Sequence, residues 1–350
     1  MYRIHICRRS AIGALTLLVS LLVICAPAYA TFPGKNGRIS FTMAGEIFTM
    51  NPDGSDVKQL TSFVPGGNTA NLPFWSPDGR QLVFGLTSLD QSSSQLWIMN
   101  GDGTNQRLLL NDPSFFDSQP AFSPDGKRIA FTRCVQNCAI YTVGTDGTGL
   151  EAVTHFDPNL DVFDFMATYS PDGKTMAFSN TARGGVIAGV YAINVDGSKL
   201  RRLTPPAIEG WSPNWAPDGQ KLTFVSHLVQ GVLDEDILLI RPDGSGQEQL
   251  TNNNRRWNGY LTGPHAARPS WSPQGDAIVF EQDVPDFSTS AIFILKTDGT
   301  THVLMYAPTG KNLIGHRLTT ARTTVKRPKN DRLRLIEQGG MSPNWGPAPQ

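Results

Sequence analysis

The sequence of 350 residues has few cysteines, no long hydrophobic run after its first 30 residues and no excess of positive charge. After residue 30, no stretch is apolar enough to cross a bilayer as a helix. The first 30 residues hold three of the 30 basic residues and none of the 30 acidic ones, so the rest of the chain carries a net charge of −3. That balance excludes the basic surface typical of a nucleic-acid-binding domain.

Common catalytic motifs are missing as well. The sequence contains no Gly-x-Ser-x-Gly nucleophile elbow, no His-Glu-x-x-His metal motif and no glycine-rich loop of the kind that holds phosphates. We therefore favour a binding protein without a cofactor over an enzyme.

The first 30 residues have the order of features of a secretory signal. Arginines precede an apolar run over residues 11–24, and Ala28-Tyr29-Ala30 forms a small-x-small cleavage site. We expect cleavage after Ala30 and a mature protein that is periplasmic or secreted. An uncleaved anchor and a twin-arginine signal at Arg8-Arg9 are the alternatives.

Two of the four cysteines, Cys7 and Cys25, leave with this signal. The remaining pair, Cys134 and Cys138, flanks three residues between two strand-like segments. Because exported proteins fold under oxidising conditions, we predict a disulfide between them.

Two short elements each occur six times after the signal. The first is an aromatic residue followed by a small residue and proline, with the aromatic at Trp75, Phe122, Tyr169, Trp215, Trp271 and Trp345. The second is Asp-Gly followed by a small residue, with the aspartate at Asp53, Asp102, Asp146, Asp196, Asp243 and Asp298. Glycine after aspartate or proline–aspartate favours tight turns, whereas calcium loops need more acidic residues than these segments have.

Segments between these markers alternate apolar and polar residues, as in "RIAFTR" and "QLWIMN". Each unit of roughly 45 to 55 residues therefore predicts a four-stranded antiparallel meander, which is one blade of an all-β propeller. The N-terminus supplies three strands, near 38–43, 46–50 and 57–61, whereas the C-terminus supplies one, near 341–345. We expect these fragments to pair and close a six-bladed ring, because closure removes exposed strand edges.

The repeated pattern "WSPDGRQLVF … QLWIMNGDGT" resembles the TolB-like six-bladed β-propeller family, with its WD40-like repeats, over about residues 37 to 347. Members that act as translocation proteins carry an α/β domain before the propeller. Fewer than ten residues separate the expected cleavage site from the first strand, so that domain is not expected in residues 31–350, which form a single propeller domain.

The turns of the two markers share one face of such a propeller, and longer, variable loops share the other. Binding residues concentrate on variable loops held by a rigid scaffold, so we expect a protein partner at that face and at the mouth of the channel. Two Phe-Asp pairs recur five residues before a repeat aromatic, which predicts an acidic, aromatic-edged rim or an aspartate that caps its own turn. The candidate contact residues are Phe116, Asp117, Phe163, Asp164, Trp211, Arg256, Trp257 and Arg268.

The alternative function is a metal-dependent carbohydrate lyase, because some enzymes of this kind resemble the fold and bind a metal through histidines at the channel. His155, His227 and His265 would be the ligands, since such a site needs about three convergent groups.

The segment of about 307–340 is a long loop with a net charge of +6, in a chain that we expect to be monomeric. The simpler interpretation of this segment is a solvated insertion. The alternative is that its charge attracts an acidic partner or an anionic membrane surface. Its basic residues are Lys311, Arg317, Arg322, Lys326, Arg327, Lys329, Arg332 and Arg334.

Overall fold

A computed structural model describes residues 32–155, 162–182, 186–227, 235–251, 266–284, 289–297, 301–306, 312–318 and 342–349. The predicted signal, the candidates Arg256, Trp257 and His265, and most of the basic segment lie outside these residues. No helix in the described part of the chain is long and apolar enough to cross a membrane.

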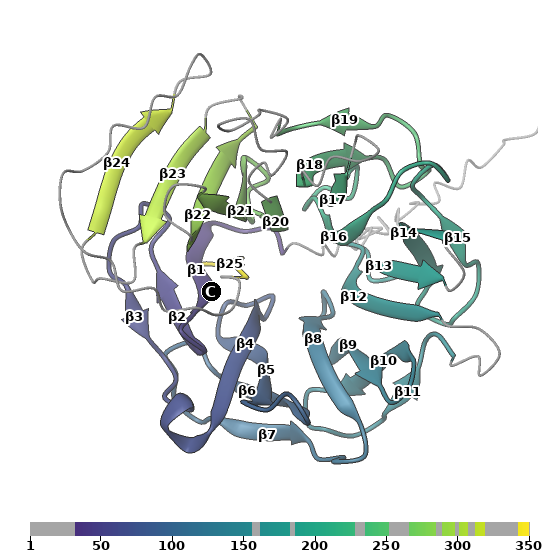
Figure 1. Ribbon diagram of the computed structural model, residues 1–350, viewed down its shortest axis with the longest axis horizontal. Helices are drawn as coiled ribbons and strands as arrows, with labels where there is room; N and C mark the ends of the chain where they lie inside the picture. Colours follow the sequence, from purple (N-terminus) through teal and green to yellow (C-terminus); the bar gives the residue numbers. More distant parts are fainter. Residues whose placement is uncertain are drawn as a thin grey trace, which may run out of the picture.

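The described residues form almost entirely β-structure, arranged as a propeller around a central channel (Figure 1). The innermost strands are β4 (Asn68–Trp75), β8 (Phe116–Phe122), β12 (Phe163–Tyr169), β16 (Trp211–Trp215), β20 (Ala266–Trp271) and β25 (Asn344–Pro347). The second strands are β1 (Asn36–Met43), β5 (Gln81–Ser88), β9 (Arg128–Cys134), β13 (Thr175–Ala182), β17 (Leu222–His227) and β21 (Ala277–Val284).

The third strands are β2 (Glu46–Met50), β6 (Ser94–Asn100), β10 (Cys138–Gly144), β14 (Val186–Asn194), β18 (Glu235–Ile240) and β22 (Thr289–Lys296). The outer strands are β3 (Lys58–Gln59), β7 (Arg107–Leu110), β11 (Glu151–Ala152), β15 (Arg201–Arg202), β19 (Glu248–Gln249) and β23 (Thr301–Tyr306). One 3₁₀ turn, η1 (Val64–Gly66), precedes β4. Within each unit, consecutive strands pair antiparallel, as the repeat pattern predicts.

Strands from the two ends of the chain lie side by side. β25 pairs antiparallel with β1, placing Trp345 opposite Ile39 and Asn344 opposite Ser40. The indole Nε1 of Trp345 also donates to the carbonyl oxygen of Gly37 at 3.2 Å. β25 contacts both β20 and β4, the last and first of the other inner strands along the chain. The strand starts three residues later than the predicted 341–345.

Four of the turns between an inner strand and the second strand are held by a serine–aspartate hydrogen bond. In the first, Ser76 Oγ donates to Asp78 Oδ1 at 2.6 Å and accepts from the backbone N–H of Gln81 at 2.9 Å. Gly79 occupies the left-handed region with φ of 68°, which glycine adopts without a steric cost. The same serine–aspartate contact recurs at Ser123, Ser170 and Ser272.

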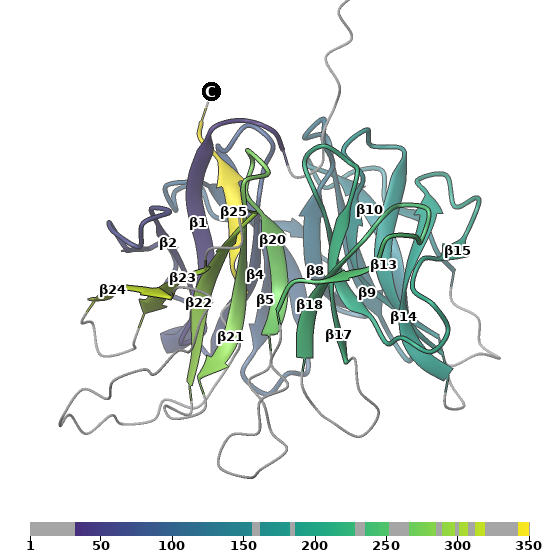
Figure 2. The ribbon, with the colours of Figure 1, turned by 90° about the horizontal axis from the view of Figure 1, so that it is seen from above.

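Five of the six Asp-Gly elements form the other set of turns, and both sets share one face, whereas the sixth, at Asp298, lies outside the described residues. Asp53 Oδ1 accepts from the hydroxyl and the backbone N–H of Ser55, and these bonds lower the pKa of Asp53. The two kinds of turn are joined by backbone bonds such as Gly101 N–H to Arg80 C=O at 2.7 Å. The described turns are as predicted, and the described loops between second and third strands, at 44–45, 89–93 and 135–137, lie at the opposite end of these strands (Figure 2).

The core lies between neighbouring sheets and contains two aromatic series. All six repeat aromatics are buried, Trp345 among them with 5% of its surface exposed. A phenylalanine near the middle of every second strand is at most 1% exposed, namely Phe41, Phe84, Phe131, Phe178, Phe224 and Phe280. Each such side chain would cost about 3–5 kcal/mol on truncation to alanine, so these two series supply much of the stability.

Two local predictions have clear outcomes. The disulfide between Cys134 and Cys138 is present, with the two Cα atoms 4.1 Å apart across the β9–β10 hairpin. The segment 307–340 is not a continuous loop, because β24 (Asn312–Leu318) lies within it and pairs with β23. Strand β24 therefore adds a fifth strand to the sheet of β20–β23, and the rest of the segment lies outside the described residues.

Candidate functional site

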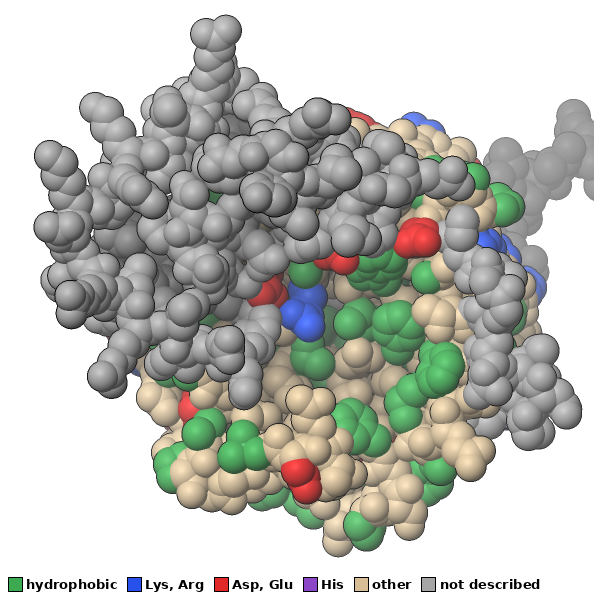
Figure 3. Space-filling model, in the orientation of Figure 1, with side chains coloured by type: hydrophobic (Ala, Val, Ile, Leu, Met, Phe, Trp, Pro, Cys, Tyr) green, Lys and Arg blue, Asp and Glu red, His purple; other side chains and the backbone are tan. Residues whose placement is uncertain are grey.

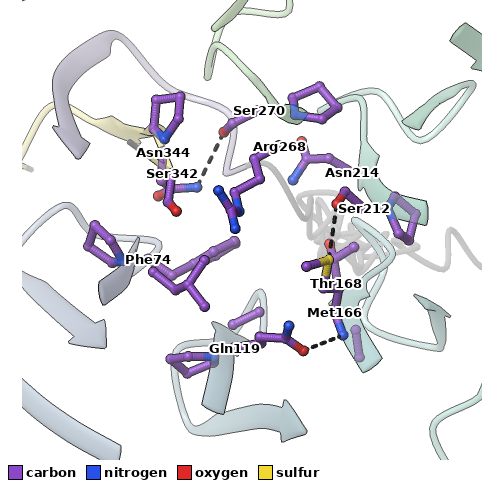
Figure 4. Close-up of a pocket in the computed structure, with 18 residues that line it drawn as sticks. Phe74, Gln119, Met166, Thr168, Ser212, Asn214, Arg268, Ser270, Ser342 and Asn344 are labelled. Carbon is purple, nitrogen blue, oxygen red and sulfur yellow. Dashed lines mark hydrogen bonds between the residues drawn. The ribbon is translucent and has the colours of Figure 1, made fainter. Parts of the chain in front are cut away.

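The inner strands enclose a cavity of about 110 Å³ on the axis of the propeller. Five inner strands each contribute three consecutive residues to its wall, and the sixth triplet consists of Asn344 in β25 and the two residues before it (Figure 4). The lining triplets are 72–74, 119–121, 166–168, 212–214, 268–270 and 342–344. Figure 3 shows hydrophobic side chains gathered around a central hollow on the face drawn there. The cavity therefore has a mostly apolar wall, to which all six inner strands contribute.

The first residue of each triplet has a left-handed backbone, although none is glycine. Their φ angles lie between 39° and 57°, a region that costs roughly 1–2 kcal/mol for a residue with a Cβ. The six are Leu72, Gln119, Met166, Ser212, Arg268 and Ser342. At five of them the register between the inner and second strands shifts, so each marks a β-bulge. Bulges re-aim side chains, and strained residues cluster at functional sites.

This ring of six residues, the channel ring, has a fixed place in the repeat that the sequence reasoning missed. Each member lies three residues before the repeat aromatic, and five of the six precede a proline. The residue types themselves share no property, so only the register to the aromatic could have revealed them. Arg268 is the one member that was also a predicted contact residue.

The last residue of some triplets joins neighbouring inner strands. Asn214 Oδ1 accepts from the backbone N–H of Trp271 at 3.1 Å, and Asn344 Oδ1 accepts from that of Trp75 at 3.0 Å. Asn344 Nδ2 also donates to Ser270 Oγ at 3.2 Å. These polar groups satisfy buried backbone donors, which explains their presence in an apolar wall.

On the other side of the channel, three ring members are joined to one another. Gln119 Oε1 accepts from the backbone N–H of Met166 at 3.1 Å and from the Thr132 hydroxyl at 2.8 Å. Ser212 Oγ donates to the sulfur of Met166 at 3.0 Å. The side chains of this half of the ring are therefore held in place by one another.

Arg268 is the one charged residue among those that line the cavity, and Figure 4 shows its guanidinium pointing into the space. Its Nη1 donates to Glu281 Oε2 at 3.0 Å, and that oxygen also accepts from the backbone N–H of Ser342 at 3.3 Å. Glu281 is 4% exposed, whereas about a third of the Arg268 side chain is accessible. The buried Nε of Arg268 has no partner among the described residues.

The two predicted aspartates do not form an acidic rim. Asp117 is 1% exposed and receives two hydrogen bonds from Arg133, from Nε at 2.8 Å and Nη2 at 2.7 Å. The two residues lie directly opposite each other on β8 and β9. The expectation of a solvent-facing carboxylate is wrong here, because the sequence alone did not show that Arg133 lies opposite Asp117 on the neighbouring strand. Nor does Asp117 cap its own turn.

The Arg133 guanidinium has further contacts on both sides. The ring of Phe115 lies 4.4 Å from its central carbon, in cation–π geometry, and Asp112 Oδ2 lies 3.5 Å from Nη1. Burial raises the pKa of Asp117, and the hydrogen bonds from Arg133 oppose that rise. The cluster is a buried structural ion pair.

Asp164, in the matching position of the next sheet, is 6% exposed and accepts from Asn180 Nδ2 at 2.5 Å. Burial raises its pKa, and the hydrogen bonds from Asn180 and Thr154 oppose the rise. It too lacks the predicted exposure, because the matching cross-strand neighbour covers it. The preceding Phe116 and Phe163 are half-buried, as is Trp211.

The histidines of the alternative prediction are not brought together in the described structure. His155 is exposed after β11, His227 ends β17, and His265 lies outside the described residues. No group of three or more His, Cys, Asp or Glu residues in the described ranges is arranged to hold a metal ion.

Comparisons with known proteins agree on the architecture. A profile of the TolB beta propeller domain family matches residues 118–313, which is more than half of the chain. An uncharacterized protein of Agrobacterium fabrum is 30% identical over 221 residues, covering 60% of this chain and 69% of its own length. The Tol-Pal system protein TolB of Anaeromyxobacter dehalogenans is 31% identical over 118 residues, covering 33% of this chain.

That match covers a quarter of the Anaeromyxobacter protein. The crystal structure of TolB from Acinetobacter baumannii superposes with a TM-score of 0.62 at 19% identity, covering 92% of this chain and 69% of the other. At that identity the superposition supports the fold alone. The repeat sequence, the propeller arrangement and the matched profile together place this chain in the TolB β-propeller family.

Proposed function

We propose that this chain is an exported, non-enzymatic binding scaffold that receives a protein partner at its variable-loop face and channel mouth. The observation that carries the proposal is the channel ring: six strained, non-glycine residues, five in inner strands and one just before β25, lie against one cavity. Backbone strain that recurs at the same position of all six lining triplets supports a binding function. Membership of the TolB β-propeller family supports the same interpretation.

The scaffold that we propose is a six-bladed ring closed by β25 against β1. Pairing of Trp345 with Ile39 and the contacts of β25 with β20 and β4 support it. Deleting residues 341–350 should lower the free energy of unfolding by at least the 3–5 kcal/mol typical of losing one buried tryptophan. Urea denaturation of the deleted chain measures this, and an unchanged midpoint would refute the closed ring.

Exposed aliphatic residues provide a matched test of the partner face. Leu89 and Val135 lie in loops between second and third strands, on the variable face, and are 53% and 62% exposed. Leu150 and Leu200 lie in turns before outer strands, on the opposite face, and are 40% and 59% exposed. A photo-crosslinking amino acid at each position compares the two faces with similar exposure.

Crosslinking is carried out with the envelope fraction of the source cells. We expect one protein to be captured from positions 89 and 135, in an amount that falls when unlabelled chain is added as competitor. Positions 150 and 200 should capture little of it. Equal capture from both faces, or capture that competitor does not reduce, would contradict the proposed face.

Export and metal binding have separate tests. Cleavage after Ala30, which places the chain in the periplasm or outside the cell, predicts a mature N-terminus at Thr31, and N-terminal sequencing of the expressed protein checks this. The alternative lyase function requires a bound transition metal. Metal analysis of the purified protein decides that alternative, since one metal ion per chain would favour it over the scaffold.

A further inference from the structure

We propose that Arg268 makes the channel a carboxylate-binding subsite, into which the partner inserts an acidic side chain. This inference rests on the proposed binding function and names the chemistry by which the cavity would recognise its ligand. It is carried by the position, the orientation and the unused hydrogen-bonding capacity of a single guanidinium group.

The position of Arg268 is set by its backbone. A left-handed φ of 50° at a β-bulge turns the side chain of this residue into the channel. Glu281, on the neighbouring strand β21, then fixes one end of the guanidinium through Nη1. A cation that is held in place by a buried carboxylate loses little conformational freedom on binding, which favours recognition.

The guanidinium has unused hydrogen-bonding capacity, and about a third of the side chain is accessible, although Nε itself is covered and a ligand would reach it only after a small shift of the side chain. Nε is buried without a partner among the described residues, and an unsatisfied buried donor is unfavourable. Arginine binds a carboxylate best through two parallel N–H···O bonds, one of which can come from Nε. A carboxylate ligand would therefore satisfy a donor that the protein leaves unpaired.

The protein already contains an arginine shared by two carboxylates. Arg133 contacts Asp117 through Nε and Nη2, while its Nη1 lies 3.5 Å from Asp112. Arg268 uses Nη1 for Glu281 in the same way, which leaves the edge that Asp117 occupies on Arg133. The ligand carboxylate would take the place that Asp117 has in the other cluster.

The size and polarity of the cavity favour a side chain as the occupant. About 110 Å³ admits several heavy atoms, whereas a helix is about 10–12 Å wide with its side chains. Pro73, Phe74, Pro269 and Pro343 make much of the wall apolar, and a charge pair is stronger in apolar surroundings than in water.

The test uses NMR of arginine Nε–Hε groups in the mature chain. The first probe is the peptide acetyl-Gly-Gly-Glu-Gly-Gly-amide, and its matched control carries Gln in place of Glu. A second pair of probes, acetyl-Gly-Gly-Gly with a free C-terminus and free glutarate, separates a chain terminus and a small molecule from an acidic side chain. The Arg268 resonance is assigned by its loss in Arg268→Lys.

We expect the Glu peptide to shift the Arg268 resonance in a saturable way and the Gln peptide to leave it in place. Arg268→Lys keeps a charge for Glu281 but lacks the planar fork, so it should bind the Glu peptide at least ten-fold more weakly. Arg201→Gln, on the opposite face, should bind it unchanged. Stronger binding of the C-terminal probe or of glutarate would reject the acidic side chain as the source.

Absence of a shift with every carboxylate probe, or equal shifts with Glu and Gln, would overturn the subsite. Far-UV circular dichroism and the unfolding midpoint check that Arg268→Lys is folded. If crosslinking captures a partner that Arg268→Lys still binds equally well, this inference fails while the scaffold function stands. If the Glu peptide binds and no partner is captured, the scaffold function fails and the subsite stands.

Discussion

The sheets that begin with β8 and β12 are neighbours with the same repeat pattern, but they use one position differently. Asp117 and Asp164 occupy the same place, five residues before the repeat aromatic, and each faces the matching residue of the second strand. In the first sheet that neighbour is Arg133, and in the next it is Asn180. One sheet therefore holds an ion pair where the other holds a carboxylate bonded to an amide.

The difference shows that a repeated residue does not imply a repeated role. Both carboxylates are buried, so each loses hydration, but only Asp117 gains a cation in return within the described structure. Removing one member of a buried ion pair leaves an uncompensated charge, whereas removing a charge that has only neutral partners does not. Matched substitutions in the two sheets should therefore give opposite results.

The largest effect is expected from Asp117→Asn. Arg133, whose side chain is 3% exposed, would keep its charge and lose its bidentate partner, which typically costs about 3–5 kcal/mol. Urea denaturation at pH 7 measures the change in the free energy of unfolding. A loss below about 1 kcal/mol would show that Asp112 and Phe115 suffice to stabilise the arginine.

A smaller effect is expected from the disulfide, which belongs to the first sheet of the comparison and not to the second. Replacing both Cys134 and Cys138 by Ser opens a loop of five residues, for which the chain-entropy relation gives about 2 kcal/mol. Reduction of the unchanged protein should give the same loss. If labelling of the unreduced, unfolded chain finds two free thiols, the disulfide is absent in solution and the two sheets do not differ in this respect.

The smallest effect is expected from Asp164→Asn, within about 1 kcal/mol at pH 7 and in the stabilising direction, because it removes a buried charge with neutral partners. Burial raises the pKa of Asp164, so the folded chain holds this proton more tightly than the unfolded chain. The contribution of this group to stability is then largest below its unfolded pKa and is lost as the pH rises through the folded pKa.

Unfolding curves across acidic pH, for the original chain and for Asp164→Asn, isolate that contribution. The difference between the two chains should favour Asp164 at low pH and Asn at neutral pH. A difference that does not change with pH would contradict the raised pKa and make the two sheets more alike than the structure indicates.

The sequence predicted the elements that recur and missed those that depend on register between strands. Strand β2 has the predicted bounds 46–50, and the serine–aspartate turns form because their residues bond to one another within a few positions. The Asp117–Arg133 pair joins residues 16 apart in sequence, and only the exact strand register brings them together. A one-residue shift would have turned either side chain to the other face.

The candidate site was harder to predict, for a similar reason. The predicted partner residues were chosen by type, as acidic or aromatic residues near loops, and Asp117 and Asp164 proved to be buried. Ring members such as Leu72 and Ser342 have no distinctive chemistry, and a bulge that re-aims one residue leaves no periodic signal. Arg268 was identified for its charge and not for its position in the ring.

In each repeat, the position that faces the channel is distinct from the position that holds the sheets together. The six members of the channel ring face a cavity, while the aromatic three positions later in each inner strand holds the sheets together. The six ring residues, Leu, Gln, Met, Ser, Arg and Ser, differ in size and polarity although the repeat around them is the same. If the channel ring binds the ligand, two relatives with the same scaffold would bind different ligands where these six residues differ. The identity of the ring residues is then a better guide to shared specificity than overall sequence identity.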